Sequence, residues 1–244
     1  MRLLILGGSG HVGSLVVPRL AALGHAITLF DVRPPRFPLP DGASFAAGDI
    51  TDLGALYQVA PGNEGVLYLA MGRMGYSSGP GDNARSSFEA NALGVWLICE
   101  AALASGSITR IVYASSLSVY EDCLERPLPD EAAVPPDATN LYGVTKRFGE
   151  DSLRAFATRS ERLSGFSLRL CFPVETAEDV ARCVAEGRDC ALTADETASA
   201  FHAALTAPEP PGRYAALHIV GSASVPRVGI ARAKELLGWE PAPR

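Results

Sequence analysis

Residues 3–13 read Leu3-Leu4-Ile5-Leu6-Gly7-Gly8-Ser9-Gly10-His11-Val12-Gly13, and this stretch decides the fold. Its uninterrupted apolar start is typical of a parallel strand that is covered on both faces. Three glycines follow in a Gly-x-x-Gly-x-x-Gly loop, and apolar residues then recur at helical spacing as far as Leu23. Glycines at this junction let the backbone approach a pyrophosphate, and the helix that follows offers its N–H groups to the phosphates. A glycine-rich turn without a ligand is the alternative interpretation.

Strand and helix patterns alternate along the rest of the chain. We predict strands at residues 2–6, 26–30, 44–47, 65–70, 110–114, 167–170 and 217–220. One helix follows the glycine loop and ends before Gly24, and others are expected at 52–60, 84–105, 141–159, 177–186, 196–205 and 230–237. This alternation predicts an α/β fold with a doubly wound parallel sheet of Rossmann type. We expect a single domain over 1–244, in which 1–172 form the nucleotide-binding core and 173–244 a small C-terminal α/β substrate cap.

Composition and charge exclude several classes of protein. The 244 residues carry a net charge of −6, which does not attract nucleic acid or an anionic membrane in bulk. No uninterrupted apolar run reaches the roughly 18 residues of a membrane helix. The five cysteines show no Cys-x-x-Cys and the four histidines no ligand spacing, so neither a disulfide scaffold nor a metal site is expected. The predicted location is therefore cytoplasmic, with Cys123 and Cys171 serving in packing.

An acidic residue ends the second predicted strand. Asp31 lies 18 residues after Gly13, where a carboxylate accepts hydrogen bonds from an adenosine ribose and repels a 2′-phosphate. This favours NAD over NADP as the cofactor, although Arg33 could pair with a 2′-phosphate, and Asp31 could be a turn residue only. Asp49, at the end of the third strand, could meet the adenine or serve in a turn.

Tyr142 and Lys146 stand four residues apart at the start of a predicted helix, so their side chains share one face. A tyrosine that moves protons near neutral pH must lose about three units from its pKa of ~10, which costs roughly 4 kcal/mol. A lysine ammonium one turn away supplies part of this. The chain has only two lysines, which makes the pair informative. An ordinary surface pair, in which Lys146 faces Glu150, is the alternative.

Hydroxyl residues follow the strand predicted at 110–114. The carboxyl ends of strands are where open α/β sheets bind ligands. Ser116 could there donate a hydrogen bond to a substrate oxygen that gains negative charge. A Ser-Ser turn without a function is the alternative interpretation.

Together these residues resemble the short-chain dehydrogenase/reductase superfamily, specifically its extended branch, the NAD-dependent epimerase/dehydratase family. The resemblance covers residues 1–172 and is carried by the glycine loop, by Ser-Ser-x-x-Val-Tyr at 115–120 and by Tyr-x-x-x-Lys at 142–146. Further positions are similar to the family's pattern, namely Gly48-Asp49-Ile50, Leu69-Ala70, Asn91 and the closing Leu-Gly-Trp at 237–239.

The resemblance implies a cofactor, catalytic roles and an assembly. It implies that Ser116 orients the substrate oxygen, that Tyr142 is the general acid/base, that Lys146 lowers the pKa of Tyr142, and that hydride passes between a substrate carbon and nicotinamide. The family's dimer interface is built from the helices that correspond to 84–105 and 141–159, so a homodimer is expected. The implied NAD-binding residues are Gly7, Gly10, His11, Val12, Gly13, Asp31, Arg33, Asp49, Ile50, Leu69, Ala70, Asn91, Tyr142 and Lys146.

The substrate is predicted to be a small molecule, a sugar, sugar acid or polyol, because only 74 residues follow Leu170 where extended members usually have well over a hundred. Residues 141–151 and 171–173 resemble the shorter uronate dehydrogenases, in which case Arg169 could clamp a carboxylate, or it could be structural. Leu117-Ser118 replaces the Asn-His expected there. Ser118, and Arg73 in the loop 72–82, are further candidates for substrate binding. An epimerase or dehydratase that recycles its own NAD, and an NAD-binding sensor without catalysis, stay open.

Overall fold

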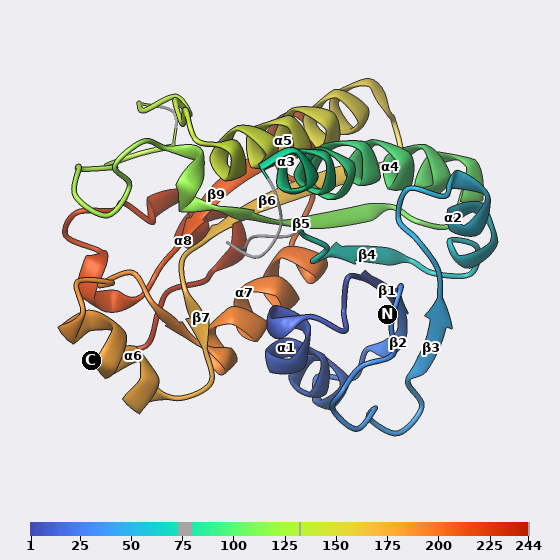
Figure 1. Ribbon diagram of the computed structural model, residues 1–244, viewed down its shortest axis with the longest axis horizontal. Coiled ribbons are helices and arrows are strands. Elements are labelled where there is room, and N and C mark those ends of the chain that lie inside the picture. The colour runs from blue at the N-terminus through green and yellow to red at the C-terminus, as the bar shows by residue number, and fades with distance from the viewer. Residues whose placement is uncertain (73–79, 132, 244) are drawn as a thin grey trace.

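The computed structural model describes residues 1–72, 80–131 and 133–243, and within them seven parallel strands form one sheet (Figure 1). The strand order is β3-β2-β1-β4-β5-β6-β9. The strands are β1 (Arg2–Leu6), β2 (Ala26–Asp31), β3 (Ser44–Ala47), β4 (Gly65–Tyr68), β5 (Arg110–Ser116), β6 (Ser164–Leu170) and β9 (Tyr214–Ile219). The prediction of a doubly wound parallel sheet is confirmed.

Helices cover both faces of this sheet (Figure 1). One layer holds α2 (Leu53–Val59), α4 (Gly94–Ser105) and α5 (Leu141–Arg159), and the other holds α1 (His11–Ala22) and α7 (Ala194–Thr206). The remaining helices are α3 (Pro80–Phe88), α6 (Ala177–Ala185) and α8 (Ala231–Leu237). Two short strands, β7 (Pro173–Val174) and β8 (Leu192–Thr193), pair in parallel beside the main sheet.

Strand β1 shows why the first apolar run is buried on both sides. Leu3 and Ile5 belong to the core cluster beneath α1 and α7, whereas Leu4 and Leu6 belong to the cluster beneath α2, α4 and α5. Side chains alternate between the faces of a strand, so a strand covered twice needs a continuous apolar run. Ile5 is paired with Leu29 on β2 and with Leu67 on β4.

Three boundaries differ from the prediction in ways that affect the site. Strand β5 continues through Ser115 and Ser116, so these hydroxyl residues are part of the sheet rather than of a turn after it. The helix expected at 84–105 begins at Pro80 and contains one π-helical turn, Glu89–Leu93. Strand β6 begins at Ser164, because its buried small residues continue the pairing with β5.

The helical stretch Gly81–Ser105 is long and apolar enough, by length and composition alone, to cross a membrane. Half of its most apolar window is buried inside the protein, where Val95, Ile98 and Cys99 pack in the core. The burial accounts for the apolar composition, as in the core helix of a globular domain.

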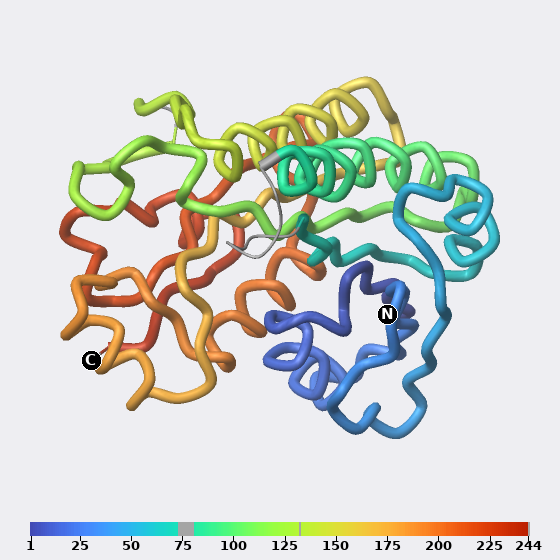
Figure 2. Tube along the Cα trace, viewed as in Figure 1, coloured from blue at the N-terminus to red at the C-terminus, as the bar shows by residue number. Residues whose placement is uncertain are grey.

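The C-terminal part of the chain joins the sheet rather than standing apart from it. Strand β9 pairs with β6, and α7 packs against α1, so residues 194–206 lie beside the first helix (Figure 2). The division of a single domain at residue 172 stays a prediction.

Strand order also decides where a ligand can bind. The chain runs from β1 to β2 and β3 on one side, and returns to β4 and β5 on the other. The crevice at such a switch point, outside the carboxyl ends of the strands, is where open α/β sheets bind ligands.

Candidate active site

A cleft of about 1840 Å³ opens at the carboxyl ends of β1, β2, β4, β5 and β6. Most of the site residues predicted from the sequence line it. These are Gly7, Gly10, His11, Val12, Gly13, Asp31, Arg33, Asp49, Ile50, Leu69, Ala70, Ser116, Ser118, Tyr142 and Lys146.

The glycine loop is packed so closely that side chains would not fit. A Cβ on Gly7, whose φ is +74°, would lie 2.4 Å from Ala70 Cα. A Cβ on Gly13 would lie 1.9 Å from the carbonyl oxygen of Gly8. The loop therefore brings bare backbone and the N-terminus of α1 to the floor of the cleft, which is the arrangement that suits a pyrophosphate.

Two polar groups of this loop are consistent with a bound dinucleotide. The Ser9 N–H donates to Asp31 Oδ2 at 3.1 Å, which fixes the carboxylate at the end of β2. Ser9 Oγ is buried and has no hydrogen-bond partner among the described residues. A buried hydroxyl without a partner is costly, and a ligand oxygen at the start of α1 would satisfy it. The residues present therefore fit NAD.

Helix α5 begins where Tyr142 must stand to reach Ser116. The Asn140 side chain caps the helix by accepting from the Gly143 N–H at 2.9 Å. Gly143 lies against the turn Leu117–Val119, since a Cβ there would be 1.9 Å from the Ser118 carbonyl oxygen. This close approach brings the Tyr142 side chain into hydrogen-bond contact with Ser116.

Lys146 is almost fully buried one turn further along α5. Its Nζ donates to the Ala114 carbonyl oxygen at 2.8 Å and lies 5.7 Å from the centre of the Tyr142 ring. Burial lowers the pKa of Lys146 to about 7, although the Glu150 carboxylate acts to raise it.

The pKa of Tyr142 differs from the expectation. It is raised above its ordinary value, because burial outweighs the hydrogen bond with Ser116. Lys146 does not lower the pKa of Tyr142 when no cofactor is bound, because burial also lowers the pKa of Lys146 and so disfavours its charged form. The sequence shows that the two groups share a helix face, but not how completely the surrounding structure excludes water from that face.

Arg169 does not line the cleft, and its predicted role as a carboxylate clamp is wrong. Its guanidinium donates to Glu150 at 2.9 and 2.7 Å and to the Tyr120 hydroxyl, with both partners of the ion pair at most 6 % exposed. Glu150 also accepts from Ser115 Oγ at 2.6 Å. Arg169 is thus the structural arginine of the alternative interpretation.

Asn91 is fully buried in the π-helical turn and also lies outside the lining of the cleft. Its side-chain amide donates to Thr145 Oγ1 at 3.0 Å, and its backbone carbonyl oxygen accepts from the Tyr113 hydroxyl. These bonds join the π-helical turn to α5 and to β5, so Asn91 supports the site from behind. Arg73 lies outside the described residues.

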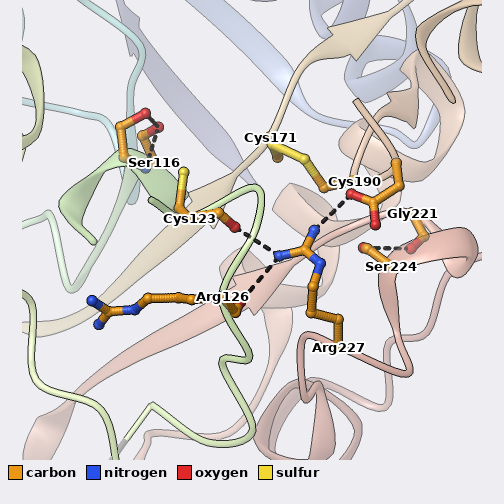
Figure 3. The surroundings of a disulfide bond; sticks show 10 residues. Ser116, Cys123, Arg126, Cys171, Cys190, Gly221, Ser224 and Arg227 are labelled. Carbon is orange, nitrogen blue, oxygen red and sulfur yellow. Dashed lines mark hydrogen bonds and ion pairs between the residues drawn. A yellow bond between two sulfur atoms is a disulfide. The ribbon is translucent and has the colours of Figure 1, made fainter. Parts of the chain in front are cut away.

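Sequence reasoning missed one wall of the cleft. This wall begins at the end of β6, and its lining residues are Cys171, Phe172, Pro173, Val174, Cys183 and Arg188. Cys171 packs in the core, as the sequence predicts, and it also forms a disulfide with Cys190, which the sequence does not predict (Figure 3). The two cysteines are 19 positions apart, and no local spacing signals that the chain returns there. His11 reaches the same wall, with its Nε2 3.1 Å from the Pro173 carbonyl oxygen.

The described residues contain no group of three or more His, Cys, Asp or Glu side chains placed to hold a metal ion.

Comparison with known proteins gives two curated relatives of different activity. The chain is 30 % identical over 149 residues to the UDP-glucose 4-epimerase of Streptomyces lividans, covering 59 % of this chain and 44 % of that one. It is 32 % identical over 161 residues to the uronate dehydrogenase of Agrobacterium fabrum, covering 64 % and 55 %. The chain thus matches only about half of each relative's length.

Solved structures share the fold. A mutated uronate dehydrogenase superposes with a TM-score of 0.79 at 24 % identity, covering 99 % of this chain and 82 % of the other. MoeE5 in complex with UDP-glucose and NAD superposes with a TM-score of 0.79 at 21 % identity, covering 100 % and 94 %.

The model of the NAD dependent epimerase/dehydratase family matches residues 3–182, which is most of the chain. That range contains the glycine loop, Asp31, Ser116, Tyr142 and Lys146. NAD is the cofactor of this family, as the sequence predicts. This chain belongs to the NAD dependent epimerase/dehydratase family.

Proposed function

We propose that this protein is an NAD-dependent oxidoreductase that transfers a hydride between nicotinamide and a hydroxyl-bearing or carbonyl carbon of a small sugar, sugar acid or polyol. The observation that carries the proposal is that Ser116, Tyr142 and Lys146 line the same cleft as the glycine loop. A protein that only bound the cofactor would have no need of this set. The curated relatives include a dehydrogenase and an epimerase, which supports catalysis in this cleft.

The glycine loop, the N-terminus of α1 and Asp31 would hold the dinucleotide, with Arg33, Asp49, Ile50, Leu69 and Ala70 along its course. When bound, NAD accepts a hydride from the substrate carbon and brings a positively charged ring into the cleft. Asp31 would favour NAD over NADP by repelling a 2′-phosphate.

The proton of the substrate hydroxyl would pass to the Tyr142 oxygen. Ser116 would donate a hydrogen bond to the substrate oxygen, and its bond with Tyr142 favours the phenolate. Lys146 has a pKa of about 7, so small changes around it switch its charge in the neutral range. In its protonated form it favours the Tyr142 phenolate nearby.

A second candidate function is an epimerase or dehydratase that reoxidises its own cofactor. The similarity to UDP-glucose 4-epimerase over 149 residues favours it. The two functions differ in one measurable respect, because reduced nicotinamide accumulates with substrate in an oxidoreductase and does not in a self-recycling enzyme.

The experiment is a screen of sugar acids, free sugars, polyols and UDP-sugars with the purified protein and NAD, read by absorbance of reduced nicotinamide and by NMR of the products. Tyr142→Phe is expected to lower kcat by roughly 10²–10⁴-fold and to leave NAD affinity within twofold. Tyr57→Phe is the matched control, because Tyr57 is exposed on α2 and does not line the cleft. Turnover retained in Tyr142→Phe would remove this residue from the mechanism.

We also propose a homodimer through the outer surface of α4 and α5. Exposed apolar side chains gather on these helices, at the end of α3 and in the π-helical turn before α4, namely Phe88, Leu93, Trp96, Leu103 and Phe148. The rings of Phe88, at the end of α3, and Phe148 on α5 lie 5.8 Å apart, so the exposed apolar surface continues from α3 to α5. Exposed apolar clusters of this kind mark interaction sites.

Cytoplasmic location stays a prediction. The disulfide argues against it, because cytosolic thiols are usually reduced.

A further inference from the structure

The wall segment, residues 171–190, begins directly beside the candidate catalytic serine. Ser116 on β5 is paired with Leu170 on β6, and the wall segment continues from Leu170. The cleft surface that this segment provides is therefore next to the position where the substrate oxygen would lie. Among residues 171–190, all of which the structure describes, Arg188 is the one charged side chain that lines the cleft.

Phe172 presents its ring to the cleft from a backbone conformation that bulky residues avoid. Its φ is +41°, and 40 % of the residue is exposed. A bulky side chain in the left-handed region is unfavourable, and such outliers cluster at ligand sites. The Arg188 guanidinium lies 5.2 Å from the centre of this ring, within cation–π distance.

The disulfide joins the two ends that carry these side chains. Cys171 precedes Phe172 directly, and Cys190 follows Arg188 by two residues, with the cysteine Cα atoms 5.6 Å apart. The far end is held to the rest of the protein, since the Gly221 N–H donates to the Cys190 carbonyl oxygen.

Arg227 makes a second anchor beside the disulfide (Figure 3). It donates to Asp189 Oδ1 at 2.6 Å and to the Cys123 carbonyl oxygen at 2.8 Å. Phe172 and Arg188 are therefore held together at a defined place in the cleft wall.

Arg188 is available to an anion. Its ion pair with Glu186 is solvent-exposed, with 36 % and 53 % of the two side chains accessible, and exposed pairs of this kind contribute little. The acidic residues Asp82 and Glu89 also line the cleft, but they stand on the opposite helical segment with Arg85 between them. A guanidinium forks onto a carboxylate through two parallel hydrogen bonds, and an aromatic ring beside it packs on the apolar face of a sugar.

We propose that Phe172 and Arg188 form a substrate-selecting pair that takes the ring and the carboxylate of a sugar acid, and that the Cys171–Cys190 disulfide holds this pair in place. The inference rests on the proposed function, and it names the substrate class of the same cleft. Reduction by a dithiol removes the constraint that the Cys171–Cys190 disulfide provides. The dithiol transfers two electrons and two protons to the disulfide, two cysteine thiols form, the dithiol becomes a cyclic disulfide, and the pair is released from its constraint.

The first test is calorimetric binding of galacturonate and of neutral galactose to the NAD-loaded protein, in the Tyr142→Phe background so that no turnover occurs. Arg188→Gln is expected to weaken galacturonate binding roughly 10- to 100-fold, as for the loss of a charge-assisted pair, and to leave galactose binding and NAD affinity within twofold. Arg188→Lys should fall between. Arg182→Gln is the matched control, because Arg182 is exposed on α6 and pairs with Asp179 outside the cleft lining.

The second test addresses the disulfide. Peptide mapping without reductant should recover the Cys171–Cys190 pair, and Cys171→Ser with Cys190→Ser should weaken galacturonate binding about tenfold or more, as should dithiothreitol on the unaltered cysteines. Cys123→Ser is the control, since Cys123 is a free cysteine that also lines the cleft.

Glucuronate is titrated in the same way as galacturonate. Two outcomes overturn the inference: both sugar acids fail to bind, or they bind equally well to Arg188→Gln. Equal binding to the double serine variant overturns the role of the disulfide. Binding that depends on Arg188, with no reduced nicotinamide from any substrate, would leave the inference standing and refute the proposed oxidoreductase.

Discussion

Replacing Glu150 by glutamine is expected to destabilise the protein strongly. Glu150→Gln preserves the shape of the side chain but removes its charge, and it places an amide NH₂ against one of the two Arg169 nitrogens that now donate to the carboxylate. Both side chains of this ion pair are at most 6 % exposed. The variant therefore leaves a buried guanidinium without its counter-charge.

The magnitude follows from that burial. Breaking a buried ion pair by removing one partner costs about 3–5 kcal/mol. For a chain of this size 1 kcal/mol corresponds to roughly 2–4 °C in Tm, so the expected loss is roughly 6–20 °C. No cost is added for the hydrogen bond from Ser115 Oγ, because the glutamine oxygen can still accept it.

The assay is urea and thermal unfolding followed by circular dichroism. Asp151→Asn is the matched control, because Asp151 is the next residue along α5 and its ion pair with Arg154 leaves 60 % of each side chain exposed. The control should change the free energy of unfolding by no more than about 0.5 kcal/mol.

Adding Arg169→Met to Glu150→Gln should recover at least half of the loss, since the unpaired cation is then gone. Glu150→Gln within about 1 kcal/mol of the unaltered protein, or no recovery in the double variant, would refute the assignment of Arg169 to a buried structural pair.

Three further perturbations test other parts of the structure. The protein should bind NAD more tightly than NADP in calorimetry. Asp31→Asn should reduce this preference at least about tenfold, because the charge that repels a 2′-phosphate is lost. An unchanged ratio of the two affinities would exclude Asp31 as the source of the preference. Burial lowers the pKa of His25 to about 4 from about 6.5 unfolded, so stability is complete above pH ~6.5 and falls toward pH 4. His25→Gln should remove about 1–2 kcal/mol of that loss in urea titrations at the two pH values, and parallel pH curves would contradict the burial of a neutral ring. Phe148→Asp should convert a dimer to a monomer in light scattering, whereas Tyr57→Asp should not, and a monomer before substitution would reject the α4–α5 interface.

Local sequence signals identified the elements and their ends. The helices expected at 52–60 and 141–159 begin at Asp52 and Asn140, where each of these side chains accepts from the backbone N–H three residues on. The continuous apolar run of β1 and the glycine loop after it also act through residues within a turn or two of each other. Such features can be read from the sequence because the interacting groups are chain neighbours. The same holds for Tyr142 and Lys146 sharing a helix face.

The tertiary structure alone decided what distant residues do to one another. In the sequence Arg169 could bind a substrate carboxylate, whereas in the structure it forms a buried ion pair with Glu150 of α5. Cys171 is predicted only to pack, and the disulfide becomes visible only when the fold brings Cys190 next to it. No local sequence pattern marks Arg188 as a binding residue, because its place in the lining of the cleft depends on the fold. Likewise the pKa of Tyr142 depends on how completely the surrounding elements exclude water. Contacts and burial of this kind depend on how strands and helices are arranged in space, and local residue spacing does not determine that arrangement.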